Sequence, residues 1–77
     1  MPELVLECEG DSLPLMVVLR EAGLAASSSE ARNRIAQGAA RIDGDVETDP
    51  KAACVAGSIR VYQCGKKRFA RVSVKKI

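Results

Sequence analysis

The sequence predicts an α+β fold in which a pair of helices packs on one face of a small, mostly antiparallel sheet. Apolar residues recur at helical spacing between residues 12 and 38. The apolar period then changes to two between residues 40 and 74. Because the helices come first and several short strands follow them, we expect separate helical and strand layers.

A chain of 77 residues forms one small domain. It buries only about 60% of its unfolded surface, so its core is thin and its stability is on the order of a few kcal/mol. It has no room for a deep substrate cavity, which argues against a free-standing enzyme. No apolar run reaches the roughly 20 residues of a membrane span, and no signal peptide is recognisable, so we expect a cytoplasmic protein.

The first segment, residues 1–11, alternates apolar and acidic side chains, with Gly10 near its end. This pattern predicts an extended linker or a lead-in strand at the edge of a sheet. The remaining residues, 12–77, are expected to form the functional domain.

The first helix is expected to begin with Ser12 as its cap and Pro14 in its first turn, where amide donors are unpaired in any case. Leu15 and Leu19 fall on its buried face, and Gly23 is expected to end it.

The second helix has a clearer start, because Ser27 and Glu30 have the spacing of a capping box. Further along this helix, Arg32 and Arg34 lie about 200° apart and cannot serve the same surface. Arg34 lies one turn beyond Glu30, which predicts an ion pair between them.

The strands in the second half of the chain show alternating apolar and polar residues. Asp43 and Gly44 form a typical two-residue hairpin turn between the first two of them. The strands are expected at residues 40–42, 45–47, 58–64 and 69–74.

Residues suited to metal binding or catalysis are scarce. Cys8, Cys54 and Cys64 are widely spaced and the chain has no histidine, so we expect three packed, reduced thiols, no metal site and no general base of that kind. The acids around the hairpin are expected to serve turn formation and solubility. We therefore expect no cofactor in this chain.

Charge is distributed unevenly along the chain. All ten acids lie in residues 1–49, whereas residues 51–77 carry eight basic residues and no acid. This predicts a positive surface with phosphate as its natural partner. The start of the second helix adds backbone donors together with Ser28, Ser29 and Arg32. Because only two aromatic residues are present, structured RNA fits better than single strands read by stacking.

Several motifs resemble the ribosomal-protein S-four type of RNA-binding domain. They are AGLAASSSEAR at residues 22–32, then Ile35, Gln37, Gly38 and RIDG at residues 41–44. The start of the chain and GKKRFARV at residues 65–72 resemble the variant at the C-terminus of bacterial tyrosyl-tRNA synthetases.

This resemblance implies a single RNA-binding surface that grips the anticodon stem and long variable arm of tRNA-Tyr. It also implies that tyrosine activation with ATP takes place in a catalytic region outside these residues. We expect the isolated domain to be a monomer. The candidate RNA-binding residues are Ser27, Ser28, Ser29, Arg32, Gln37, Arg41, Lys66, Lys67, Arg68 and Arg71.

The sequence departs from the family pattern at four positions. Ser28 and Asn33 replace basic residues, Arg34 replaces an aliphatic residue, and Asp43 replaces the asparagine of the hairpin turn. Two other hypotheses stay open: a free-standing S-four-like protein that binds ribosomal RNA, and a module that binds proteins through a β-edge.

Overall fold

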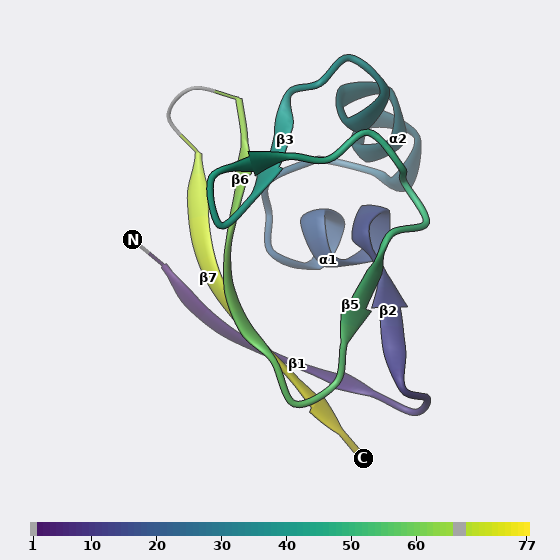
Figure 1. Cartoon of the computed structure of the whole chain (residues 1–77), viewed down its shortest axis with the longest axis vertical. Helices are drawn as coiled ribbons and strands as arrows, with labels where there is room; N and C mark the ends of the chain where they lie inside the picture. Colours follow the sequence, from purple (N-terminus) through teal and green to yellow (C-terminus); the bar gives the residue numbers. More distant parts are fainter. Residues whose placement is uncertain (1, 66–67) are drawn as a thin grey trace.

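Two helices pack on one side of a five-stranded sheet, as the sequence predicts (Figure 1). The computed structural model describes residues 2–65 and 68–77. The strands in this part of the chain are β1 (Glu3–Cys8), β2 (Ser12–Pro14), β3 (Ala40–Ile42), β4 (Asp45–Val46), β5 (Ala53–Val55), β6 (Ile59–Cys64) and β7 (Phe69–Lys76). The helices are α1 (Leu15–Glu21) and α2 (Ser28–Ala36).

The main sheet has the strand order β1-β7-β6-β3-β4. All neighbouring strands are antiparallel except β1 and β7, which run parallel. The predicted lead-in strand therefore forms one edge of the sheet. The predicted hairpin turn is also confirmed: Asp43 and Gly44 both have positive φ, 52° and 89°, as a two-residue hairpin of the mirror-image turn type requires.

The first helix begins later than the sequence predicts. Ser12 does not cap it; Ser12–Pro14 is instead strand β2, which pairs with β5 in a small second sheet beside α1. Pro14 occupies the cap position and provides no side-chain hydrogen bond. The backbone explains the difference, because Leu15 donates its amide hydrogen to Ala52 O at 3.0 Å, so the residues entering α1 are tied to the strand after the hairpin.

The core lies between the sheet and the helices. Inward-facing residues of β6 and β7 pack against the buried faces of α1 and α2, and all three cysteines are buried free thiols, as predicted. The largest fully buried side chains are Tyr62, Leu15, Leu19, Ile35, Val18, Val72, Val74 and Cys54.

Tyr62 brings a hydroxyl into this core. Within the described residues, Tyr62 Oη has no hydrogen-bond partner of normal geometry. Two effects raise the pKa of Tyr62: burial is the larger, and the interaction with the Cys54 thiol is the second. Burial also raises the pKa of Cys54. The contact between the two groups is weak, because thiols are poor donors and acceptors.

Ser27→Ala should lower the free energy of unfolding by about 1 kcal/mol, because it removes the cap of α2. Urea denaturation would measure the change in the transition midpoint. Ser29→Ala is the matched control: Ser29 is exposed on the first turn, and alanine suits a helix, so the midpoint should stay or rise slightly. Equal midpoints for both variants would contradict a stabilising cap at Ser27.

Candidate nucleic-acid interface

The start of α2 is built by its capping box. Ser27 Oγ accepts a hydrogen bond from the Glu30 amide at 3.2 Å, as predicted. The return bond differs by one residue, because Glu30 Oε2 accepts from the amide of Ala26 and not of Ser27. The amides of Ser28 and Ser29 make no backbone hydrogen bond within the described residues, so they remain donors for an anion.

Arg20 lies at the start of α2, although it is not among the candidate residues chosen from the sequence. Its Nη1 donates to Ser28 Oγ at 2.8 Å, and its Nη2 pairs with Glu21 at 3.1 Å. The contact joins the end of α1 to the start of α2. It places a positive charge where the family pattern has a basic residue at position 28. No local sequence pattern identifies this contact, because it depends on how the two helices pack.

The two arginines of α2 serve different surfaces. Arg34 Nε pairs with Glu30 Oε1 at 3.1 Å, which confirms the predicted ion pair. The amide of Ala26 first, and Arg34 second, hold the pKa of Glu30 below its ordinary value. Arg32 is exposed and forms no ion pair with any residue that the structure describes. Its guanidinium is therefore available to a phosphate.

The end of α2 meets the β6–β7 turn through the backbone. Gln37 is the C-cap of α2 and is exposed. Arg34 O accepts a hydrogen bond from the Ala39 amide, and Ala39 O accepts one from the Gly65 amide, both at 3.0 Å. A shallow hollow at this junction is lined by Gly38, Ala39, Arg41, Gln63 and Gly65.

Arg41 lies on β3, on the sheet face that points away from the helices. Its neighbour on β6 is Gln63, whose Nε2 donates to Gly65 O at 2.8 Å. The Arg41 guanidinium is exposed and donates to Gly44 O at 3.3 Å. This bond holds the side chain alongside the hairpin turn.

Asp43, the negative residue of the hairpin turn, is engaged on both carboxylate oxygens. Oδ1 accepts a hydrogen bond from the Val61 amide at 2.9 Å, and Oδ2 lies 3.4 Å from Arg60 Nη1. Asp43 therefore ties the turn to β6. Because Arg60 faces this carboxylate, the departure at position 43 adds less negative potential to the surface than its formal charge suggests.

The basic turn between β6 and β7, residues 65–68, is only partly described. The predicted residues Lys66 and Lys67 lie outside the described residues. Arg68 is exposed, and its carbonyl accepts a hydrogen bond from the Cys64 amide at 3.1 Å. Arg68 also contributes to the lowered pKa of Glu30, so this cation lies within electrostatic range of α2.

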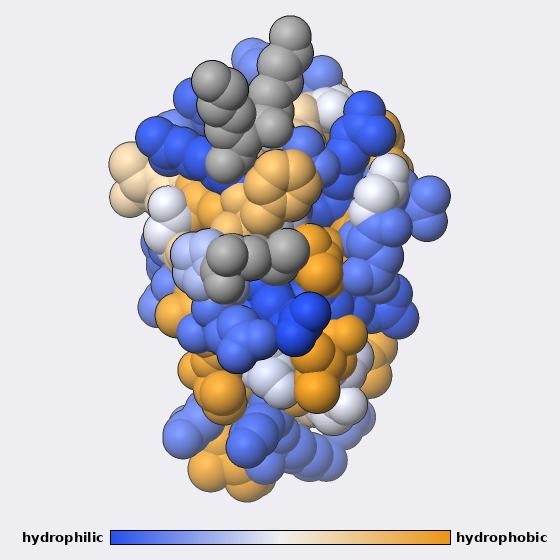
Figure 2. Space-filling view, turned by 90° about the vertical axis from the view of Figure 1, so that its left-hand side faces the viewer, coloured by the Kyte–Doolittle hydropathy of each residue, from blue (hydrophilic) through white to orange (hydrophobic). Residues whose placement is uncertain are grey.

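Arg71 stands apart from the other candidate residues. It lies on the outward face of β7 and pairs with Glu3 at 2.9 Å. Figure 2 views the molecule from the side where β7 lies, and hydrophilic and hydrophobic residues alternate there. The structure thus brings the end of α2 and β3 together at the top of Figure 1, and Gly65 donates a hydrogen bond to Ala39 O there. Arg71 lies further along β7, opposite Glu3 of β1 and Val61 of β6.

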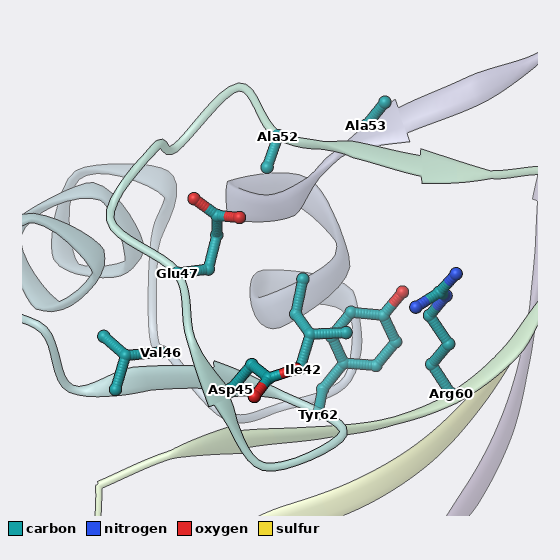
Figure 3. A pocket seen from close by; sticks show the side chains of 8 residues that line it. All are labelled: Ile42, Asp45, Val46, Glu47, Ala52, Ala53, Arg60 and Tyr62. Atoms are coloured by element: carbon teal, nitrogen blue, oxygen red, sulfur yellow. The ribbon is translucent and has the colours of Figure 1, made fainter.

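A separate pocket opens between β4, β5 and β6 (Figure 3). None of the candidate RNA-binding residues that the structure describes lines it. Its acidic residue Glu47 accepts hydrogen bonds from the amides of Thr48 and Asp49, both at 3.0 Å. This carboxylate therefore shapes the loop, which agrees with the predicted role of the acids near the hairpin. The lining residues are Ile42, Asp45, Val46, Glu47, Ala52, Ala53, Arg60 and Tyr62.

Residues 2–65 and 68–77 contain no group of three or more side chains that could hold a metal ion. Neither helix has the length and apolar character needed to cross a membrane.

Comparison with known proteins gives matches over almost the whole chain. The tyrosine–tRNA ligase of Colwellia psychrerythraea is 43% identical over 74 residues, which are 96% of this chain and 18% of that protein. The tyrosine–tRNA ligase of Francisella tularensis is 46% identical over 63 residues, or 82% of this chain and 16% of that protein. The chain thus spans less than a fifth of the length of these relatives.

A solved structure and a family model agree with these relatives. The solution structure of a tyrosyl-tRNA synthetase C-terminal domain superposes with a TM-score of 0.70 at 27% identity, covering 92% of this chain and 77% of that one. The S4 domain model matches residues 13–58, which include both helices, the β3–β4 hairpin and β5. The chain belongs to the S4 family of RNA-binding domains.

Proposed function

We propose that the chain is the tRNA-binding domain of a tyrosine–tRNA ligase and grips the anticodon stem and variable arm of tRNA-Tyr. The observation that carries the proposal is the corner where exposed polar residues of α2 and β3 lie beside Gly65, the first residue of the basic turn. The names of the relatives and of the solved domain support tRNA-Tyr as the RNA in this proposal.

The chemistry of this corner suits phosphate groups. Arg32 and Arg41 are exposed guanidinium groups, and the first amides of α2 point outward at the positive end of the helix dipole. Arginine binds phosphate through two parallel hydrogen bonds, which positions a backbone without reading its sequence.

Structured RNA fits this surface better than an unpaired strand. Stacking of unpaired bases needs exposed aromatic rings. Tyr62 is fully buried and Phe69 is only 39% exposed, so no pair of rings is available for two successive bases. Recognition would therefore depend on the shape of a folded RNA and on its phosphates.

In this proposal the chain itself performs no catalytic step. Tyrosine activation with ATP would belong to the larger part of the protein that the relatives have in addition to this domain. The domain would act in the cytoplasm and as a monomer when isolated. The match to ligases favours this proposal over a free-standing protein that binds ribosomal RNA.

The proposal predicts which class of RNA binds most tightly. The chain should bind tRNA-Tyr with a long variable arm more tightly than a tRNA with a short one, and an unstructured oligonucleotide of equal length most weakly. Gel shifts at a fixed salt concentration would measure the three affinities. Equal or tighter binding to the unstructured oligonucleotide would overturn the proposal.

The second prediction concerns the basic turn. Replacing Lys66, Lys67 and Arg68 by alanine should lower the affinity for every structured RNA by a similar factor, because phosphate contacts carry no sequence information. The slope of log affinity against log salt should become shallower by roughly 0.7–0.9 per charge removed. Titrations at several salt concentrations would measure both effects.

A matched control for this variant is Lys75→Ala with Lys76→Ala, at the far end of β7. Lys76 pairs with Asp11 at 2.9 Å, so these charges should contribute little to RNA binding. If the slope per removed charge is the same in both variants, the basic turn acts only through net charge and does not contact the RNA.

The third prediction concerns Arg32. Arg32→Ala should weaken binding and also reduce the preference for tRNA-Tyr, because this side chain lies beside the backbone amides that fix the geometry of the contact. Arg32→Lys keeps the charge but loses the planar fork, so it should restore overall affinity more than preference. Competition binding between the two tRNAs would measure preference, and identical losses for both tRNAs would contradict this role.

A further inference from the structure

Within residues 2–65 and 68–77, strand β1 leaves one row of backbone groups without a strand partner. Among these residues it pairs only with β7, in parallel register. Pro2 O and Cys8 O accept hydrogen bonds from the amides of Arg71 and Ile77, so even-numbered residues of β1 direct their backbone groups toward β7. By the same alternation, residues 3, 5 and 7 direct their N–H and C=O groups to the open edge. Such an edge is a template for another strand.

A groove runs beside this open edge, between β1 and α1. Its apolar lining comes from Val5, Leu6, Leu13 and Val17. Leu6 and Leu13 pack against the core on one side only and are half-buried, and Val5 is 58% exposed. A strand added to β1 would place alternate side chains over this apolar floor.

The rim of the groove is acidic. Glu7 and Glu21 line it, and Glu9 is exposed at the end of β1. Glu3 lies on the same strand and is 69% exposed even in its ion pair with Arg71. The acidic rim repels RNA phosphates, so this edge is not an extension of the RNA-binding surface.

The same charges disfavour a second copy of the chain. Antiparallel pairing of two β1 strands about Val5 would set Glu3 directly opposite Glu7 at both ends. Like charges at directly opposed positions destabilise a strand pair. An occupant that carries basic residues therefore complements this edge better than a second copy paired about Val5.

We propose that the β1 edge binds an extended, basic segment of a partner protein by adding a strand to the sheet. The residues on the two faces of β1 determine the side-chain pattern expected in the bound segment. Positions opposite Glu3 and Glu7 would be basic, and the position opposite Val5 would be β-branched. Positions opposite Leu4 and Leu6 would be apolar and would face the groove. The expected motif is basic–apolar–β-branched–apolar–basic in either strand direction. This inference does not depend on the proposed RNA.

A designed peptide tests the proposal. The probe is a blocked peptide with the core Lys-Val-Thr-Val-Lys, added to the isotope-labelled 77-residue chain and followed by NMR. We expect saturable shifts at the amides of Glu3, Val5 and Glu7, with slower hydrogen exchange there and none of these changes at α2. The peptide with glutamate in place of both lysines should bind roughly two- to fivefold more weakly.

Variants of the edge separate strand addition from simple charge attraction. Val5→Pro removes one outward N–H group but no hydrogen bond to β7. It should therefore lower the affinity for the peptide about two- to tenfold, whereas Val5→Thr should leave this affinity unchanged. Glu7→Lys should shift the preference toward the glutamate peptide. This variant tests the proposal even if the fold does not tolerate proline at position 5. Unchanged binding in Val5→Pro with a preserved fold, peptide shifts at α2 instead of β1, or displacement of the peptide from β1 by tRNA would each overturn the proposal.

Discussion

The backbone connection between the end of α2 and the β6–β7 turn is the constraint on which the candidate site depends. Two hydrogen bonds in series, from Ala39 to Arg34 and from Gly65 to Ala39, fix the helix end against the turn. They form only because Gly38 and Gly65 adopt positive φ, 76° and 83°, which lets the chain reverse directly after the helix and again after β6. The geometry of the surface is therefore set by backbone hydrogen bonds, and its side chains are free to contact a ligand.

The parts of the structure that the sequence predicts well are local. The cap of α2, the ion pair of Glu30 with Arg34 and the hairpin turn at Asp43 each depend on residues within four positions of one another. The start of α1 was predicted wrongly, because Ser12 has the right chemistry for a cap and only its pairing with Val55, far along the chain, makes it part of a strand. Strands of three residues give too few alternations to be recognised from periodicity.

The contacts that shape the candidate site are mostly non-local, which is why the sequence analysis missed them. Arg20 reaches Ser28 only because α1 and α2 pack together, and Asp43 meets Arg60 only through the pairing of β3 with β6. The candidate residues on α2 and β3 could be chosen from motif and charge. The separation of Arg71 from them could not, because it follows from the parallel pairing of β1 with β7.

Folding also redistributes the charges that the sequence separates into an acidic and a basic part. Arg60, Arg71 and Lys76 of the basic part each pair with an acid from the first 43 residues, namely Asp43, Glu3 and Asp11. All three pairs are exposed, so they contribute little to stability, yet each reduces the local positive potential. Along β7 the positive charge is therefore partly neutralised wherever β1 and the segment after it lie alongside. Arg68, at the opposite end of β7 beside α2, is in none of these pairs. The parallel edge strand and the segment after it thus have an electrostatic consequence: they bring acids to Arg71 and Lys76, whereas Arg32 and Arg41 form no ion pair within the described residues.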